Sequence, residues 1–521
     1  MSLRTYFLLF ISGLILPFII AQFQPVPGYL DSDYYFAGGL QLAKGNGFTE
    51  PYLWNYLDGV TSLPHPSHTY WMPLASIVSA FGMWVTGQAT YASARLPFIV
   101  IAALVVPVTA ALAYAFSKKR DLALISALLA IFSVYHAPFV GVTDNFSLFM
   151  LFGSMYFIVA TKLLEDVSHD RYWFFLGLLA GLFSLSRSDG LLWLALTFLF
   201  LLWRVPRDAF SRFARDVLIK SLLVFLGFLV IMAPWYARNL KIFGTLMAPG
   251  GSRALWLENY DQTFTYPPED LSMESFLVYG WNEIVSDRLW ALGTNLQSGF
   301  AAHGGIILFP FIIAGAIYFR KNERVKLAIT AWLILFFVMS FIFPFAGARG
   351  AFFHAGAALQ PMWWTLAPLG LDEILRSLRK RNWGNDQTKV IFRSALVMVV
   401  MILTAFVVNL RLFALGWGEG EAEYPVVEAF LLEQGVRSDD IVIVRNAPGY
   451  YIGTQRSAIS IPYGGEEAIL AVAEQFNANY LVLESQAALP QIKDLLENQQ
   501  DHEDFIFLGE VDGTHIFKIN R

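Results

Sequence analysis

Two aspartates lie two positions apart near the start of the chain, at Asp31 and Asp33, in a segment rich in tyrosine. A carboxylate can accept the proton of a hydroxyl group as a general base, and two carboxylates can hold a divalent cation. A pair of solvated acids in a loop shows the same spacing. Asp31 and Asp33 are therefore the first candidates for catalysis, with the choice between base, cation site and plain loop acids open.

Two histidines and a third aspartate follow along the chain. His65 and His68 flank a Pro-Ser pair, and Asp144 comes directly before a long apolar run. Imidazole nitrogens can bind a metal or a substrate hydroxyl, and both residues can equally be ordinary loop histidines. Asp144 also has the position of a helix N-cap, which alone would explain an aspartate there. We expect these residues to position an acceptor or a cation.

Three arginines and a histidine lie beside later apolar runs, on the side opposite to the main basic clusters: Arg187, Arg238, Arg349 and His354. Arginines on that side oppose the bias that keeps basic residues in the cytoplasm. A guanidinium group can offer paired hydrogen bonds to a phosphate, and it can also anchor lipid headgroups. Together with the acids upstream, these residues predict a site at the lipid–water boundary that suits a lipid phosphate ester.

The composition indicates that lipid covers part of the chain. Of the 521 residues, 56% are hydrophobic and 15% are charged, and the mean hydropathy is +0.51. Soluble domains contain fewer apolar and more charged residues than this chain. Disordered chains contain still fewer apolar residues, so this chain is not a disordered one. The absence of cysteine excludes thiol nucleophiles, thiolate metal sites and disulfides. No basic stripe with interleaved aromatic residues is present, so nucleic acid is not an expected partner.

About eleven apolar runs predict a polytopic α-helical membrane domain over residues 1–411. If the N-terminus is cytoplasmic, all basic clusters between these runs lie on the cytoplasmic side of the plasma (inner) membrane. The region after residue 411 then lies on the extracytoplasmic side. The first outer loop then covers about 22–92, and its apolar stretch 72–86 is too short to span and predicts a re-entrant or interfacial helix. The predicted spans are 6–21, 93–116, 121–137, 145–163, 172–186, 190–203, 217–234, 300–319, 326–344, 352–370 and 390–411.

Residues 419–521 form a separate acidic region, with 18 acidic and 6 basic residues. Its alternation of short apolar segments predicts a small extracytoplasmic α/β domain. No glycine loop suited to a nucleotide phosphate is present in it, so packing or acceptor holding is a simpler role than catalysis. We expect helices at 424–434, 466–476 and 490–498, strands at 440–445 and 480–484, and a hairpin of 505–510 with 514–519.

Several segments in order along residues 1–370 resemble the GT-C integral-membrane glycosyltransferases. The resemblance is to the group that contains the dolichyl-phosphate-mannose protein mannosyltransferases and the bacterial aminoarabinose transferases. It rests on an Asp-acid-Tyr pattern, a short stretch ending in glycine, a His/Pro/Tyr-rich segment and three later motifs. In this chain these are residues 31–35, 42–47, 65–73, 143–145, 186–190 and 234–239.

The resemblance implies transfer of a sugar, with inversion, from a polyprenyl-phosphate donor to a protein, lipid or glycan acceptor on the extracytoplasmic face. Asp31 matches the base of that group best, because Tyr35 follows four positions later, where a tyrosine is usual. The second position is more often Glu but is Ser32 here, so the division of labour between Asp31 and Asp33 stays open. Substrate binding would fall to Tyr35, His65, His68, Asp144, Arg187, Arg238, Arg349 and His354. No organic cofactor is implied, and a divalent cation is optional.

Two other functions compete with this interpretation. A lipid or solute transporter or flippase would carry charged groups near mid-span or two similar halves with broken helices. The predicted spans show neither feature. A non-enzymatic envelope assembly factor would use the acidic region to bind a partner and would not depend on Asp31.

Overall fold

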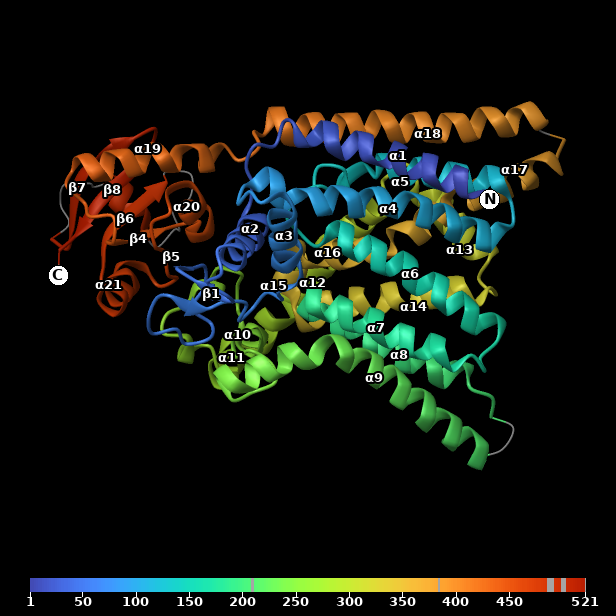
Figure 1. Cartoon of the computed structure of the whole chain (residues 1–521), viewed down its shortest axis with the longest axis horizontal. Helices are drawn as coiled ribbons and strands as arrows, with labels where there is room; N and C mark the ends of the chain where they lie inside the picture. The colour runs from blue at the N-terminus through green and yellow to red at the C-terminus, as the bar shows by residue number, and fades with distance from the viewer. Residues whose placement is uncertain (208–209, 383–384, 485–491, 498–502, 521) are drawn as a thin grey trace. The chain divides into compact units, whose positions relative to one another are not determined.

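The computed structural model describes residues 1–207, 210–382, 385–484, 492–497 and 503–520, and its helices and strands are labelled in Figure 1. The chain divides into two compact units. Unit 1 comprises Met1–Phe23, Arg95–Arg238 and Asp287–Leu415, and unit 2 comprises Gln24–Ala94, Asn239–Ser286 and Gly416–Arg521. Unit 2 thus groups Gln24–Ala94 with the C-terminal region, and the division into domains 1–411 and 419–521 stays a prediction.

Unit 1 is built from apolar helices, and each predicted span contains one. Long runs rich in Leu, Phe, Ile and Ala favour helix, and polar clusters or proline separate the runs. The helices are α1 (Leu3–Ala21), α4 (Tyr91–Ser117), α5 (Arg120–Phe132), α6 (Phe146–Glu165), α7 (Asp170–Ser186), α8 (Leu191–Arg204), α9 (Phe210–Phe243), α12 (Trp281–Ser298), α13 (Phe309–Tyr318), α14 (Glu323–Phe337), α15 (Pro344–Ala346), α16 (Phe352–Gly356), α17 (Gln360–Arg379) and α18 (Asp386–Asn409).

Six helices among the described residues are long and apolar enough to cross a membrane, which makes this a multi-pass membrane protein. They contain α1, α4, α6, α9, α14 and α18. The prediction of about eleven spans is not confirmed, because α5, α8 and α13 have 13, 14 and 10 residues, and a span needs about 20.

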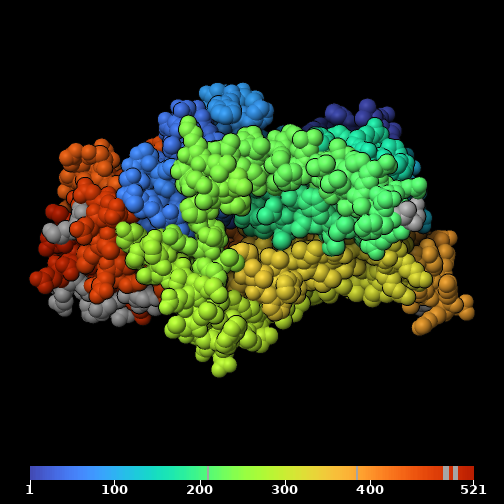
Figure 2. Space-filling model, turned by 90° about the horizontal axis from the view of Figure 1, so that it is seen from below, coloured from blue at the N-terminus to red at the C-terminus, as the bar shows by residue number. Residues whose placement is uncertain are grey.

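The side chains on α9 show why lipid is needed. Leu222, Phe225, Leu226 and Val230 are between 47% and 59% exposed, although they lie in the middle of an apolar helix. This helix lies at the surface in the green band of Figure 2. Large apolar side chains gathered in this way on one exposed helix are rare at the surface of soluble proteins.

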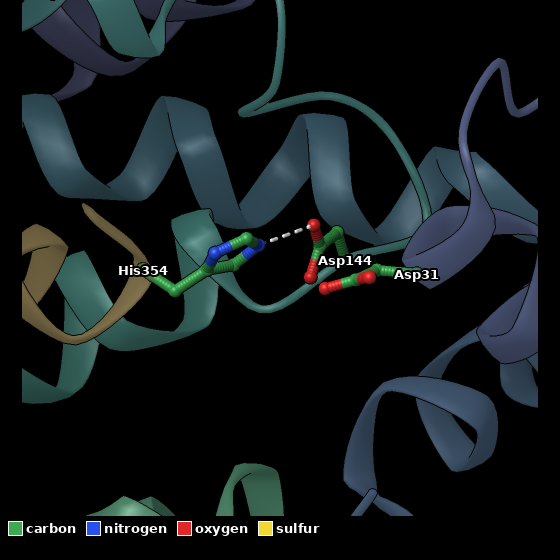
Figure 3. A group of neighbouring side chains, drawn as sticks. All are labelled: Asp31, Asp144 and His354. Carbon is green, nitrogen blue, oxygen red and sulfur yellow. Dashed lines mark hydrogen bonds and ion pairs between the residues drawn. The ribbon is translucent and has the colours of Figure 1, made fainter. Parts of the chain in front are cut away.

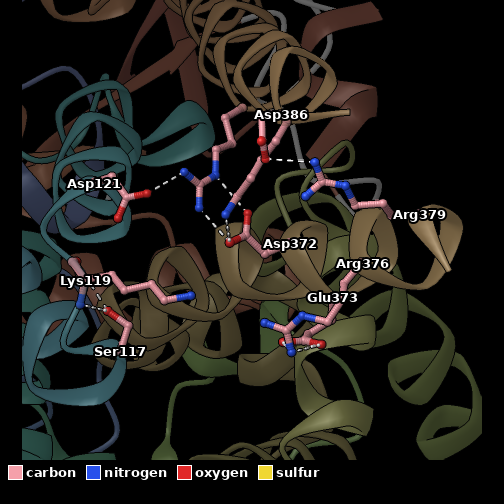
Figure 4. Close-up of polar contacts among 10 residues, drawn as sticks. Ser117, Lys119, Asp121, Asp372, Glu373, Arg376, Arg379 and Asp386 are labelled. Atoms are coloured by element: carbon pink, nitrogen blue, oxygen red, sulfur yellow. Dashed lines mark hydrogen bonds and ion pairs between the residues drawn. The ribbon is translucent and has the colours of Figure 1, made fainter. Parts of the chain in front are cut away.

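Charged residues join the ends of α5, α17 and α18 in unit 1 (Figure 4). The guanidinium group of Arg393 donates to both oxygens of Asp372, at 2.8 and 2.6 Å, and to Asp121 at 2.6 Å. Arg376 pairs with Glu373, and Arg379 pairs with Asp386. Arg376 and Arg379 belong to the basic cluster 376–381, which is expected on the cytoplasmic side, whereas Arg393 lies in the predicted span 390–411.

Unit 2 contains a six-stranded sheet with the order β2-β5-β4-β6-β8-β7. The first four strands in this order run parallel, and β8 and β7 are antiparallel neighbours. The edge strand β2 comes from the first outer loop, so this sheet is not formed by the C-terminal region alone. The strands are β2 (Tyr52–Leu53), β4 (Ile441–Val444), β5 (Ala458–Ser460), β6 (Ala478–Glu484), β7 (Phe505–Val511) and β8 (Thr514–Ile519).

The C-terminal helices agree with the predicted pattern and add one helix to it. The ends of the predicted helix 490–498, residues 490–491 and 498, lie outside the described residues. The helix α20 and the strand β5 were not predicted, because Pro448, Gly449 and Gly453 make that segment look like a loop. The helices are α19 (Glu419–Glu433), α20 (Ala447–Thr454), α21 (Gly465–Phe476) and α22 (Lys493–Glu497).

The rest of unit 2 consists of short elements, of which α2 and α3 matter most for the candidate site. The expected helix at 72–86 is present as α3, and it packs against α2. Gly38 and Gly39 of α2 permit this close approach, since an added Cβ would lie 2.7 Å from Ser76 Oγ and 2.6 Å from Ser79 Cβ. The elements are α2 (Leu30–Ala43), α3 (Leu74–Thr86), α10 (Gly250–Arg253), α11 (Met273–Tyr279), and the strands β1 (Thr49–Glu50) and β3 (His65–Pro66).

Candidate functional site

Asp31 and Asp33 lie in the first turn of α2 and therefore in a helix, not in an open loop. Carboxylates are favourable at this end of a helix because of its dipole. Two positions apart on a helix means about 200° of rotation, so the two side chains point in different directions. Asp33 is completely buried, whereas Asp31 is only half-buried.

Asp33 is enclosed by residues of the C-terminal region. The amide Nδ2 of Asn446 donates to Asp33 Oδ2 at 2.7 Å, and the carboxyl group of Glu421 forms a further hydrogen bond with Asp33. Burial, together with the charge of Asp31, raises the pKa of Asp33 to about 7, although the two hydrogen bonds act in the opposite direction. Sequence reasoning missed Asn446 and Glu421, because nothing local marks either residue.

Tyr35 and its neighbour Tyr34 are buried beside Asp33 in α2. The hydroxyl group of Tyr34 accepts the backbone N–H of His68 at 2.7 Å. The ring of Tyr35 lies 6.0 Å from the ring of Trp71. Tyr35 therefore packs inside unit 2, and its contact with a substrate stays a prediction.

His68 is buried with both ring nitrogens engaged. Nδ1 lies 2.7 Å from Ser67 Oγ, and Nε2 lies 2.9 Å from Ser76 Oγ on α3. His68 also has a positive φ of 62°. Its contacts connect the loop to α3, and its part in binding a substrate stays a prediction.

His65 is buried between two carboxylates of unit 2. Its Nε2 lies 3.0 Å from Asp58 Oδ2, and its Nδ1 lies 3.4 Å from Glu50 Oε1. Burial disfavours the charged ring, but hydrogen bonds and charges of Asp58 and Glu50 outweigh burial and raise the pKa of His65 to about 9. The imidazolium ring is thus held as a cation at neutral pH, with no nitrogen left for a metal.

In unit 1 the structure brings together two predicted residues that are 210 positions apart, Asp144 and His354 (Figure 3). Nε2 of His354 lies 3.0 Å from Asp144 Oδ2, and the ring stacks on Phe146 with centroids 4.1 Å apart. Nδ1 lies 3.0 Å from the carbonyl oxygen of Gly350, which can only accept, so Nδ1 carries a hydrogen. The Asp144–His354 contact then needs one further proton, which the two groups share.

Asp144 does not cap α6, although its position suggested that role. Asn145 is the N-cap residue, and no side chain forms a cap hydrogen bond there. Asp144 instead lies 1% exposed and faces His354. A buried carboxylate that contacts an imidazole is a stronger indication of function than a carboxylate that caps a helix.

The three predicted arginines differ in their surroundings within unit 1. Arg187 forms a bidentate pair with Asp189, with Nε and Nη2 at 3.2 and 3.0 Å from Asp189 Oδ2. The guanidinium group of Arg238 lies 4.6 Å from the centre of the Trp235 ring. Arg349 is exposed and lies five positions before His354. An arginine already paired with an acid has less to offer a phosphate, which weakens the case for Arg187.

A further arginine of unit 1, Arg95, was not predicted. It is 4% exposed, and it donates from Nε to the carbonyl oxygen of Gly141 at 3.0 Å and from Nη1 to that of Ala21 at 3.1 Å. It thereby holds the segment that leads to Asp144. The signal was present in the sequence, since Arg95 is a charged residue inside a predicted span.

No protein-family model matches the sequence, and no curated protein matches it significantly. Solved structures do resemble the fold. The Archaeoglobus fulgidus oligosaccharyltransferase in its apo form has a TM-score of 0.58 and 13% identity, over 100% of this chain and 75% of that chain. The oligosaccharyltransferase AglB from Archaeoglobus fulgidus, in complex with an inhibitory peptide and a dolichol-phosphate, has a TM-score of 0.55 and 13% identity over the same shares.

ArnT from Cupriavidus metallidurans bound to undecaprenyl phosphate also resembles this chain, with a TM-score of 0.52 and 12% identity, over 99% of this chain and 98% of that chain. The similarity therefore extends through nearly the whole chain with two kinds of enzyme. At this level of identity the comparison concerns the fold and leaves activity to be argued from residues. The predicted resemblance to the GT-C membrane glycosyltransferases is confirmed at the level of the fold.

Proposed function

We propose that this protein is a glycosyltransferase that moves a sugar from a polyprenyl-phosphate donor to an acceptor on the extracytoplasmic face. The observation that carries the proposal is the fold, which this chain shares along nearly its whole length with structures bound to dolichol-phosphate and to undecaprenyl phosphate. Acids and arginines at predicted outer positions are the residue types that such a reaction needs. The plasma (inner) membrane, a cytoplasmic N-terminus and about eleven spans belong to the same proposal.

The general base in this proposal is Asp31. A sugar or protein hydroxyl is a poor nucleophile until a carboxylate accepts its proton in the transition state. The base must touch the acceptor, and Asp33 is enclosed by Asn446 and Glu421, whereas Asp31 is half-buried. Attack from the side opposite to the departing phosphate would give inversion.

The phosphate of the donor needs cationic groups as it departs, and Arg349 is the strongest candidate. It is exposed, as a group that binds a substrate phosphate must be. Arg238 is a second candidate, and its guanidinium group packs on the ring of Trp235. A phosphate bound by a guanidinium group is a better leaving group, since negative charge develops on it in the transition state.

The Asp144–His354 pair is proposed to position the acceptor. It is buried, its two groups share a proton, and the carboxylate can accept a hydrogen bond from a hydroxyl group. A carboxylate and an imidazole are also ligands that divalent cations accept. Activity measured with EDTA, and again after Mg²⁺ or Mn²⁺ is added back, decides whether a cation takes part.

The proposal is tested with the full-length protein in nanodiscs and a panel of polyprenyl-phosphate sugars, with membrane extract as the acceptor source. Mass spectrometry measures the polyprenyl phosphate released. We expect release from at least one donor, dependent on both protein and extract, and equal release by the surface variant Glu269→Gln. Glu269 is a fair control because its side chain is 67% exposed. Turnover of no donor by a folded protein that still complements a deletion strain would overturn the proposal.

A further inference from the structure

The segment that leads into α2 is held by the start of the C-terminal region, within unit 2. The indole Nε1–H of Trp417 donates to the carbonyl oxygen of Val26 at 3.0 Å, and the ring of Tyr29 packs edge-on against the same indole. Gly28 lies flat against it, with φ at +89°, and an added Cβ would lie 2.3 Å from Trp417 Nε1. Only glycine fits both this conformation and this close approach.

Asn446 adds a contact whose direction is fixed by local structure. It is the N-cap residue of α20, and its Oδ1 accepts the backbone N–H of Gly449 at 3.1 Å. Because Oδ1 is committed to the cap, Nδ2 must point the other way. That nitrogen donates to Asp33 Oδ2 at 2.7 Å.

Glu421 completes the enclosure from the first turn of α19. Its carboxyl group hydrogen-bonds with Asp33 and with the backbone N–H of Gly28. Two carboxyl groups can form such a contact only when they share a proton. Burying a pair of acids costs stability, and replacement by apolar residues would often be neutral or stabilising.

The stability cost of burying two acids points to a role beyond packing. Asp33 shares one helical turn with Asp31, so a contact that holds Asp33 also acts on Asp31. Side chains extend about 5 Å from a helix axis, so a rotation of α2 by about 15° would move a carboxylate by about 1.3 Å. A misplacement of about 1 Å can reduce catalysis by about 100-fold. Fixing Asp33 therefore fixes the direction in which Asp31 points.

We propose that Glu421 and Asn446 are positioning residues that act through Asp33 to orient the Asp31 carboxylate. This inference rests on the proposed function, in which Asp31 is the base. It gives the C-terminal region a part in the reaction that requires no contact with either substrate. It also explains why acids occur at both ends of a contact that an apolar pair could make.

The test compares variants that differ only in the contact with Asp33. Asn446→Ser keeps an N-cap side chain but is too short to reach Asp33, and Glu421→Ala removes the second contact. Glu421→Gln retains a hydrogen-bond donor and serves as the conservative rescue. Glu433→Ala is the matched control, because Glu433 is an exposed acid on the same helix.

We expect Asn446→Ser and Glu421→Ala to lower kcat by at least ten-fold, while the donor KM changes less than three-fold and thermal unfolding shifts little. Glu421→Gln should retain at least a third of wild-type kcat, and Glu433→Ala all of it. On an Asp33→Ala background, adding Asn446→Ser should cost less than three-fold, because the contact is already lost.

Wild type and Asp31→Asn are measured in the same series. If Asp31→Asn is inactive while Asn446→Ser and Glu421→Ala match wild type, the positioning inference fails alone. The inference is also overturned if the losses of kcat merely follow the fraction of unfolded protein. It is overturned as well if Glu421→Gln lowers kcat as much as Glu421→Ala does. If Asp31→Asn keeps full activity, the proposed base fails, and the positioning inference with it.

Discussion

Both units bury a histidine against carboxylate groups, but the two arrangements differ. In unit 2, His65 lies between Asp58 and Glu50, 3.0 and 3.4 Å away. In unit 1, His354 faces Asp144 with Nε2 and donates to a backbone carbonyl from Nδ1. Two acids keep one ring charged at neutral pH, whereas a one-to-one pair shares a proton that can move. The first arrangement suits structure and the second suits chemistry.

The first prediction extends the comparison to the two acids of α2. Asp31→Asn should lower kcat by about 10² to 10⁴-fold, the range expected for loss of a general base. Asp33→Asn should cost about ten-fold, because an amide still fills the buried site but cannot share a proton with Glu421. Both kcat values are measured at saturating donor. An equal loss in the two variants would remove the distinction between them.

The second prediction concerns the unit 1 pair. Asp144→Asn and His354→Gln should each lower kcat/KM for the acceptor by about 10 to 100-fold, because each leaves the other buried group without its partner. The double variant should be no worse than about three-fold below the poorer single variant. Simple additivity of the two losses would show that the residues act independently.

The third prediction separates the arginines. Arg349→Gln should raise the donor KM by about ten-fold, as expected for one lost hydrogen bond to a charged group. Arg187→Gln should raise it less than three-fold, since that side chain is already paired with Asp189. Donor titrations of both purified variants provide the comparison, and the reverse order would reassign the phosphate ligand.

The smallest effect on activity is expected at His65, where stability should change instead. His65→Gln should lower the free energy of unfolding by roughly 2–4 kcal/mol at pH 6, because it leaves two buried acids without a cation. The pKa of His65 is raised to about 9 in the fold, so its stabilisation is complete below about pH 6.5 and is lost as pH rises through 9.

Thermal unfolding measured from pH 6 to 10 checks this prediction. The wild type should lose stability across that window, and His65→Gln should lose distinctly less. An equal slope in the two proteins would show that other groups set the pH dependence. Loss of kcat in a folded His65→Gln would instead support the predicted role of His65 in positioning an acceptor or a cation.

Local features of the fold could be predicted from the sequence, and long-range pairings could not. Apolar runs located most helices of unit 1, though not α12, and most C-terminal elements, because these depend on neighbouring residues. The pairing of β2 with β5 and the contact of Asp33 with Asn446, 413 positions away, depend on tertiary structure. Asp144 and His354 were each predicted as site residues, but their hydrogen bond was not.

The histidines of the first outer loop show the limit for single residues. The His-Pro-Ser-His pattern fitted a metal or hydroxyl site as well as it fitted a loop. The partners that decide its role are Asp58 and Ser76, which no spacing rule connects to it. Asp31 keeps its predicted role as the proposed base, because the structure encloses its neighbour and leaves Asp31 half-buried.

The central claim is that this chain transfers a sugar rather than moving a lipid across the membrane. The most direct measurement uses proteoliposomes that contain the wild type and a donor labelled in its sugar, with acceptor on one side only. We predict one polyprenyl phosphate released for each sugar attached to the acceptor, with the anomeric configuration inverted. Appearance of intact labelled donor in the opposite leaflet, without any release of polyprenyl phosphate, would contradict the account and indicate a flippase.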